Sequence, residues 1–218
     1  MTGYAVYYDR YGYLGYGVNA SRELTESSPP QVIREPLEVL EMATYLKLPI
    51  SMFTNPEKNA ELRAMITAAR VAAEVEQNRD LVRKQIDMTL DYWPPCPIEL
   101  GTPLISVDLV RYLDANGTFT TLTENADYKV FKDKRPGFIT PLYNQTWPTF
   151  TPQPSSSLLV RFSCGHSFDS VFWSDLGSLV KQGMKNLISD WWNNGVPMGV
   201  VNPGIVSSLR VGAVPRVR

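Results

Sequence analysis

Apolar residues recur at intervals of three and four in the first third of the chain, which is the spacing of one helix face. The first such stretch follows Glu35-Pro36 and ends before Pro49. Its apolar positions are Val39, Met42, Ala43 and Leu46. The second stretch follows Asn55-Pro56, a pair typical of an N-cap and a first helical residue, and reaches Asn78, where a left-handed C-cap is expected. Its stripe comprises Leu62, Met65, Ile66, Ala69, Ala72 and Ala73.

A third helical pattern lies near the C-terminus. Ser174 or Asp175 is expected to cap it, and Gly195 and Pro197 end it. Its apolar face comprises Leu176, Leu179, Val180, Met184, Leu187, Ile188 and Trp191. The three patterns together predict a small bundle of two N-terminal helices plus a C-terminal helix.

Between these helices the apolar period changes to two, starting at Val82, which is typical of half-buried strands. The predicted strands cover residues 82–90, 105–112, 119–122, 128–131, 137–139 and 158–162. Asn116-Gly117 predicts a hairpin with a type I′ turn, because that turn needs a positive φ at both central residues. The sequence therefore predicts an antiparallel β-rich subdomain inserted into the bundle.

The predicted fold class is α+β, with extended terminal tails. The expected divisions are a Tyr/Gly-rich arm over 1–31, a helical part of the core over 32–81, a β-rich insertion over 82–172, a closing helix over 173–195 and an extended C-terminal tail over 196–218.

Both tails suggest contacts with other chains. The N-terminal arm is either a flexible leader or a docking arm, since tyrosines bury area at modest entropic cost. Its tyrosines are Tyr4, Tyr7, Tyr8, Tyr11, Tyr13 and Tyr16. The C-terminal tail is expected to bind another chain as an extended segment and to add little to core stability. Val201, Ile205 and Leu209 would fill pockets there, and Arg210, Arg216 and Arg218 would meet an acidic surface. Ala69, Ala72 and Ala73 are the expected subunit interface, because small side chains let another backbone approach closely.

Composition excludes some classes of protein. Hydrophobic residues make up 44% and charged residues 20% of 218 residues, which is ordinary for a globular fold. The net charge of -1 argues against a general nucleic-acid binder. No apolar run approaches the ~20 residues of a membrane helix, so no membrane partner is expected. Cys96 and Cys164 form neither a disulfide framework nor a C-x-x-C pair.

Few residues suit catalysis or metal binding. A cysteine-dependent site would have to pair Cys164 with His166, the only histidine, and a buried cysteine beside a loop histidine is the simpler interpretation. One histidine and two separated cysteines are too few for a usual zinc site. Asp87 and Asp91 fit the solvated face of a strand better than a cation site. We therefore expect no catalytic residue, no metal and no cofactor.

Several motifs occur in an order that resembles a known family. The helical motifs are Glu35-Pro36-Leu37-Glu38-Val39, Tyr45-Leu46-Lys47-Leu48, Ala60-Glu61-Leu62, Ala68-Ala69-Arg70 and Gln77-Asn78-Arg79-Asp80-Leu81. The β-rich motifs are Leu90-Asp91-Tyr92-Trp93-Pro94, Tyr112-Leu113-Asp114-Ala115-Asn116-Gly117, Ala126-Asp127-Tyr128, Pro136-Gly137-Phe138-Ile139, Thr146-Trp147-Pro148 and Val160-Arg161-Phe162. Over residues 33 to 194 this order resembles the head–tail connector (adaptor, or head-completion) proteins of tailed bacteriophages.

The resemblance implies a structural protein of the virion rather than an enzyme. It implies a homo-oligomeric ring, typically a dodecamer, at the neck under the portal, assembled in the host cytoplasm. The ring would join the portal to a stopper or tail protein, and double-stranded DNA would pass through its lumen without sequence-specific binding. The C-terminal tail would then be the portal-binding segment.

Two alternatives stay open at this point. One is another neck protein, such as a stopper or tail-completion protein, although these tend to be smaller and mostly β. The other is the cysteine-dependent enzyme using Cys164 and His166.

Overall fold

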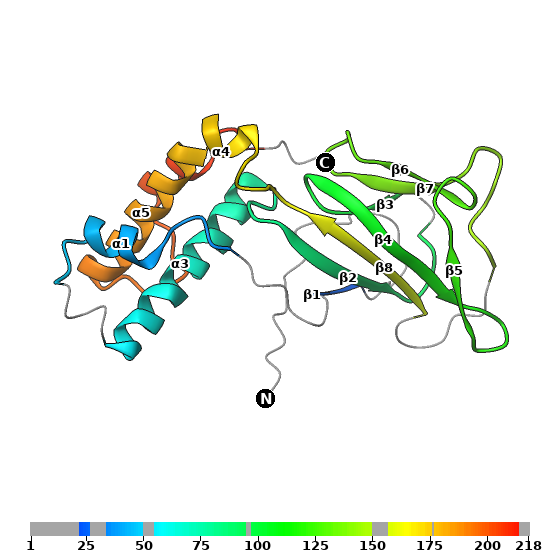
Figure 1. The fold of residues 1–218 in the computed structure, drawn as a ribbon, viewed down its shortest axis with the longest axis horizontal. Helices are drawn as coiled ribbons and strands as arrows, with labels where there is room; N and C mark the ends of the chain where they lie inside the picture. Colours follow the sequence, from blue (N-terminus) through cyan, green and yellow to red (C-terminus); the bar gives the residue numbers. More distant parts are fainter. Residues whose placement is uncertain are drawn as a thin grey trace. The chain divides into compact units, whose positions relative to one another are not determined.

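A computed structural model describes residues 34–49, 55–94, 97–149, 157–175 and 177–213, and the backbone of residues 22–26 (Figure 1). Contacts divide the chain into two compact units. The helical unit contains residues 33–82 and 166–217, and the sheet unit contains residues 1–32 and 83–165, with Arg218 also assigned to it. The fold mixes helices with antiparallel sheets, so the predicted α+β class is confirmed.

The helical unit packs around two long helices. Its elements are α1 (Val39–Tyr45), α3 (Pro56–Gln77), α4 (Val171–Asp175), α5 (Gly177–Asn194) and α6 (Pro203–Leu209). Helix α5 packs against α3, α4 and α6, and α1 packs against α3. Their apolar faces enclose one core that includes Met42, Ile66, Met184, Leu187 and Ile188, each at most 2% exposed. Only one face of each helix is buried, which is why the sequence shows helical periodicity there.

The ends of α3 form as predicted. The Asn55 side chain accepts hydrogen bonds from the backbone N–H groups of Glu57 and Lys58, at 2.9 and 3.3 Å, and Pro56 opens the helix. Asn78 ends it with a left-handed φ of 52°. These local contacts satisfy backbone groups that the helix leaves free at its termini.

The sheet unit contains two antiparallel sheets. Its strands are β1 (Arg22–Glu26), β2 (Lys84–Leu90), β3 (Ile98–Glu99), β4 (Leu104–Leu113), β5 (Phe119–Leu122), β6 (Tyr128–Phe131), β7 (Phe138–Pro141) and β8 (Leu158–Cys164). One sheet has the order β1-β2-β8-β4-β5 and the other has the order β3-β7-β6. All six predicted strands are present, and the structure adds the short strands β1 and β3, which the sequence pattern does not predict.

Both sheets contribute to one apolar core. Met88, Val110, Val160 and Phe162 from the larger sheet and Ile139 from the smaller one are all fully buried there. A Cβ at Gly137 would lie 2.4 Å from Leu104 Cβ, closer than any side chain tolerates. Glycine at position 137 therefore allows β7 to approach the larger sheet.

The β4–β5 hairpin is confirmed, but its predicted type I′ turn is wrong. Gly117 has a φ of 76°, and no other residue of this turn has a positive φ. The N–H of Gly117 donates to the Asp114 carbonyl at 3.0 Å, and the Asp114 carboxylate accepts from the N–H groups of Asn116 and Thr118. Asp114 thus stabilises a longer turn in which one glycine supplies the positive φ.

The C-terminal segment departs from the predicted extended tail. Residues 203–209 form helix α6, which Asn202 caps through a 3.0 Å hydrogen bond from the N–H of Gly204, with Pro203 in the first turn. Leu209 is fully buried in the helical core. The reason is an amphipathic turn that gains more from packing on its own subunit than from remaining extended.

Candidate functional site

The alanine stripe on α3 faces the subunit's own core. Ala69 and Ala73 are fully buried, and Ala72 packs against the same cluster. Helices α3 and α5 contact one another along this face. The small side chains therefore serve helix packing inside one subunit, so assigning Ala69 and Ala73 to a subunit interface is wrong.

The predicted docking residues of the C-terminal tail divide into three groups. Leu209 is fully buried, and Val201 and Ile205 pack against the helical core, so these side chains fill their own subunit. Arg210 is exposed and pairs with Glu76 at 2.7 Å. Arg216 and Arg218 lie outside the described residues, as do all six tyrosines of the arm: Tyr4, Tyr7, Tyr8, Tyr11, Tyr13 and Tyr16.

Hydrogen bonds hold the C-terminal segment on the helical unit. The Gln77 side-chain amide donates to the carbonyls of Leu209 and Val211, at 2.7 and 2.8 Å. The Arg79 guanidinium donates to the carbonyl of Gly212. Gln77 is fully buried, so these bonds satisfy a side-chain NH₂ group that would otherwise be costly to bury. The path of the chain up to residue 213 is thereby fixed at the end of α3.

Nothing in the described residues marks Cys164 and His166 as a catalytic pair. Cys164 is fully buried in the core of the sheet unit. His166 stacks on Phe172 in the helical unit, with ring centroids 4.2 Å apart. A thiol with no exposed surface offers no access to a substrate in this conformation.

The aspartates of β2 and β4 are held by polar partners. Both oxygens of Asp87 accept 2.7 Å hydrogen bonds from the Arg161 guanidinium, an arrangement that raises the pKa of Arg161.

Within the described ranges, no group of three or more His, Cys, Asp or Glu side chains could hold a metal ion. Among the same residues, no helix is long and apolar enough to cross a membrane.

Asp108 lies on the polar face of the larger sheet. Burial raises its pKa, but hydrogen bonds from Ser106, Gln85 and Ser163 and the charge of Arg83 outweigh burial and lower its pKa below the ordinary 3.8. The three hydrogen bonds are 2.7, 2.8 and 2.9 Å long. Because the folded-state pKa is lowered, the stabilisation is present above the ordinary pKa and is lost as pH falls through the lowered value.

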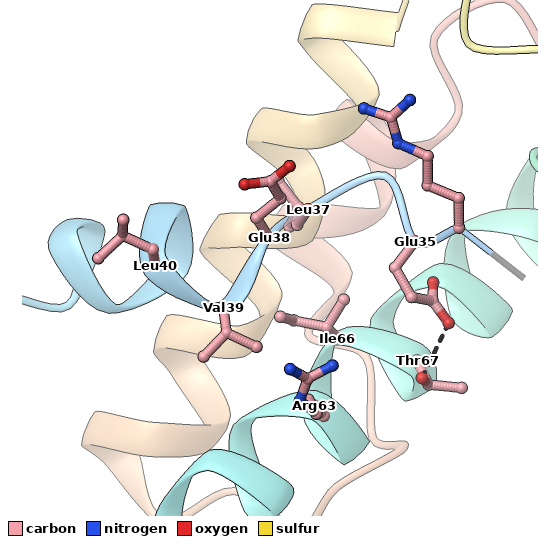
Figure 2. Close-up of a pocket in the computed structure, with 9 residues that line it drawn as sticks. Glu35, Leu37, Glu38, Val39, Leu40, Arg63, Ile66 and Thr67 are labelled. Carbon is pink, nitrogen blue, oxygen red and sulfur yellow. Dashed lines mark hydrogen bonds between the residues drawn. The ribbon is translucent and has the colours of Figure 1, made fainter. Parts of the chain in front are cut away.

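A groove of about 630 Å³ lies between residues 34–40 and helix α3 (Figure 2). Ile66 and Val39 give it apolar lining, and Leu40 beside it is 67% exposed. Arg34, Arg63 and Glu38 place charges around the apolar part. This chemistry suits an apolar side chain of a polypeptide with polar neighbours.

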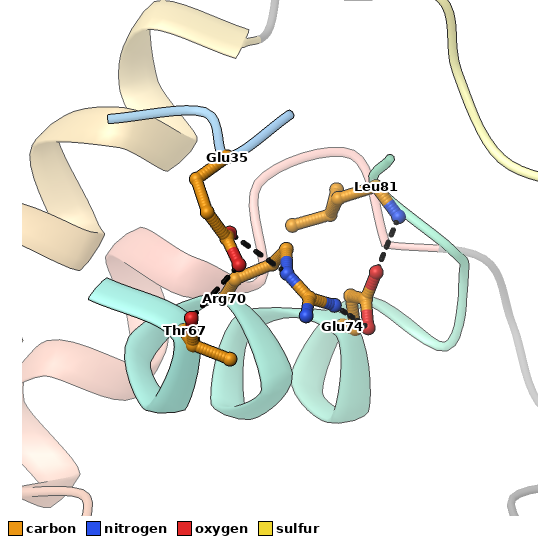
Figure 3. Close-up of polar contacts among 5 residues, drawn as sticks. All are labelled: Glu35, Thr67, Arg70, Glu74 and Leu81. Atoms are coloured by element: carbon orange, nitrogen blue, oxygen red, sulfur yellow. Dashed lines mark hydrogen bonds and ion pairs between the residues drawn. The ribbon is translucent and has the colours of Figure 1, made fainter. Parts of the chain in front are cut away.

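Charged groups connect this groove to the end of α3 (Figure 3). Arg70 pairs with Glu35 at 2.9 Å and with Glu74 at 3.0 Å, although Arg70 is 2% exposed and Glu74 has no exposed surface. The second oxygen of Glu74 accepts from the N–H of Leu81, and Glu35 accepts from the Thr67 hydroxyl. The buried pair therefore joins the segment before α1 to the segment that follows α3.

Sequence reasoning missed α6 and the Arg70–Glu74 pair. The signal for α6 was present, because Asn202-Pro203 repeats the Asn55-Pro56 pair that marks the start of α3. Arg70 and Glu74 are spaced as an ordinary surface pair on a helix, so only tertiary packing shows that they are buried.

The fold is similar to that of chains in solved particles of a gene transfer agent (GTA). One is in the virion of the native particle, with a TM-score of 0.61 and 20% sequence identity. Another is in the neck of the empty particle, computed with C6 symmetry, with a TM-score of 0.59 and 19% identity. A third is in the neck of the native particle, computed with C12 symmetry, with a TM-score of 0.55 and 21% identity. Each similarity covers 86% of this chain and 98% of the other chain.

These similarities establish a shared fold that extends across both units. No protein-family model and no curated protein matches the chain.

Proposed function

We propose that this protein is a structural head–tail adaptor of a phage-like particle. It forms a homo-oligomeric ring in the neck, under the portal and above a stopper or tail protein, and DNA passes through its lumen. The observation that carries the proposal is the shared fold with chains from GTA necks, which spans 98% of those chains and both units of this one. Their C6 and C12 symmetry supports a ring of several copies.

The site chemistry supports a binding role for this chain. The described surfaces offer a groove with both apolar and charged lining and exposed apolar side chains such as Leu40 and Val171, which are 67% and 73% exposed. Such features suit contacts with other polypeptides. The enzyme alternative loses its main support because the thiol of Cys164 is fully buried.

The two chain ends carry the proposed partner contacts. Residues 214–218, which include Arg216 and Arg218 and follow the anchored α6 segment in the sequence, contact an acidic surface of the portal. The tyrosines of the N-terminal arm dock on a neighbouring subunit or another neck protein. Both assignments concern residues outside the described ranges and rest on their sequence.

Particle imaging of the purified chain mixed with the cognate portal tests the proposal. We expect a closed ring of this chain on one end of the portal, with six or twelve copies by analogy with the C6 and C12 necks. One or two copies bound at that vertex would exclude the ring. Binding only to a portal that already carries another ring would favour a stopper over an adaptor.

A further inference from the structure

The β6–β7 hairpin of the smaller sheet carries a group of exposed basic side chains outside the groove. Strand β6 pairs with β7 in antiparallel register, and Phe131 lies opposite Phe138 at the base of the connecting loop. Their rings stack with centroids 4.7 Å apart. This contact fixes the two ends of the loop, so residues 132–137 project from a stable base.

The side chains around this loop are basic and exposed. They are Lys129, Lys132, Lys134 and Arg135, and we refer to them as the basic hairpin. Asp133 is the one acidic residue among positions 129–135, which leaves a local charge of +3 in a chain whose net charge is -1. The basic hairpin is therefore a local exception in a chain that is otherwise slightly acidic.

The described structure provides these charges with no ion-pair partner. Other basic residues are paired with carboxylates, such as Arg161 with Asp87, Lys185 with Glu41 and Arg210 with Glu76. In the part of the chain that the structure describes, no carboxylate lies within ion-pair distance of the four basic side chains. Lys129 only approaches the Phe131 ring, at 5.6 Å from its centroid. Like charges held this close repel one another, and a polyanion would relieve that repulsion.

We propose that the basic hairpin binds the phosphate backbone of double-stranded DNA, without reading its sequence. Exposed lysines suit phosphate, because an ammonium group acts as a mobile point charge and needs no fixed geometry. A protein partner fits less well, since lysine is depleted in protein–protein interfaces and this loop exposes no large apolar side chain. The inference rests on the proposed function and adds to it that each subunit turns this hairpin toward the lumen, so that a ring would surround passing DNA with a band of basic side chains.

A loop with four basic side chains binds weakly in a single subunit. Each neutralised phosphate contributes about 0.9 to the slope of log K against log salt, so affinity falls steeply with ionic strength. Several hairpins in one ring would act together through their high effective concentration. Weak individual contacts that exchange quickly are compatible with DNA that moves through the lumen.

The test is fluorescence anisotropy of the purified full chain with a labelled duplex of random sequence, about 20 base pairs long, over a salt series. The first variant combines Lys132→Gln, Lys134→Gln and Arg135→Gln. The matched control combines Lys47→Gln, Lys58→Gln and Lys181→Gln, which removes the same charge from the helical unit outside the groove. Thermal unfolding checks that both variants stay folded.

We expect the hairpin variant to bind at least about tenfold more weakly at low salt and to lose about 2 to 3 from the salt slope. Apart from the general effect of a lower net positive charge on DNA binding, the control should change the affinity for the duplex less than about twofold. Wild-type binding by the hairpin variant, an equal loss in both variants, or no binding by the wild type would each overturn the inference.

Imaging the hairpin variant with portal separates this inference from the proposed function. Rings that form normally, together with weakened DNA binding, support both. The absence of rings with the wild type refutes the adaptor proposal, whatever the free chain does with DNA. Loss of portal docking with unchanged DNA binding would show that the basic hairpin meets an acidic protein surface instead.

Discussion

Arg70 and Glu74 show how single charged residues are kept inside the helical unit. Besides their mutual ion pair, Arg70 donates to the Glu35 carboxylate, and the Glu74 carboxylate accepts from the N–H of Leu81. Removing one partner from such a buried pair leaves an uncompensated charge, which costs more than the pair itself contributes. The pair therefore constrains where the chain can pass before α1 and after α3.

Glu74→Gln should lower the free energy of unfolding by about 2–3 kcal/mol, because the buried Arg70 loses the charge of a fully buried carboxylate partner. Glu61→Gln is the matched control. It removes an exposed pair with Lys58 and should cost less than about 0.5 kcal/mol. Urea unfolding of both variants measures the difference, and equal stability of the two would contradict the structural role of Glu74.

The thiol of Cys164 should react slowly in the folded protein. In a Cys96→Ser variant it is the only thiol, so labelling reports on this position alone. Because Cys164 has no exposed surface, we expect labelling at least about a hundredfold slower than in denaturant. Labelling at the rate of an exposed, activated thiolate would revive the interpretation as a cysteine-dependent enzyme.

Among the elements, α6 contributes both packing and hydrogen bonds. Its last residue, Leu209, is buried in the helical core, and the carbonyls of Leu209 and Val211 accept from the buried Gln77 amide. Upstream of α6, the Trp191 indole N–H donates to the Val200 carbonyl at 2.7 Å. This segment belongs to the folded subunit, although its sequence is rich in residues that usually interrupt structure.

Two truncations separate the structural part of the C-terminus from its proposed docking part. A chain ending at Met198 should lose about 3 kcal/mol or more of stability, because it loses the burial of Leu209 and leaves Gln77 without its acceptors. A chain ending at Ala213 keeps the burial of Leu209 and the carbonyl acceptors of Gln77, so it should unfold at the wild-type temperature. It should nevertheless fail to dock on portal, because it lacks Arg216 and Arg218. Normal docking by this chain would exclude residues 214–218 as the portal contact.

At the scale of the whole molecule, the two units have separate hydrophobic cores. The chain passes from the helical unit into the sheet unit near Val82 and returns near His166. A mutation in the core of one unit is therefore expected to destabilise mainly that unit, since energetic coupling follows shared contacts.

Hydrogen exchange measured by mass spectrometry can test this separation. Gly137→Ala should speed exchange in β4, β7 and β8 and cost about 2–3 kcal/mol, because the new Cβ would overlap Leu104. Glu74→Gln should speed exchange in α3 and α5 instead. Gly204→Ala is the control, since its Cβ would meet Asn202 Oδ1 only at 3.5 Å. Equal effects of either core variant on both units would show that they unfold as one.

The sequence by itself determined the elements whose signals lie within a few residues. The Asn-Pro start and Asn78 end of α3 depend on local backbone hydrogen bonds, and the alternation in β2 depends on one face being more buried than the other. The Asn116-Gly117 hairpin was also predictable, although Asp114 decided its turn type through contacts that composition does not show.

Only the tertiary structure decided which surfaces meet. Strand β8 lies between β2 and β4, more than 40 residues away along the chain, and this order depends on shared burial of their apolar faces. Ala69 and Ala73 read equally well as an interface or a core until α5 is seen to cover them. The surface against which α6 packs was equally unpredictable from the sequence, because a short apolar segment can bury itself on any surface that fits. Its own subunit supplied that surface through Gln77 and through Gly183, where a Cβ would lie 2.9 Å from the Leu209 side chain.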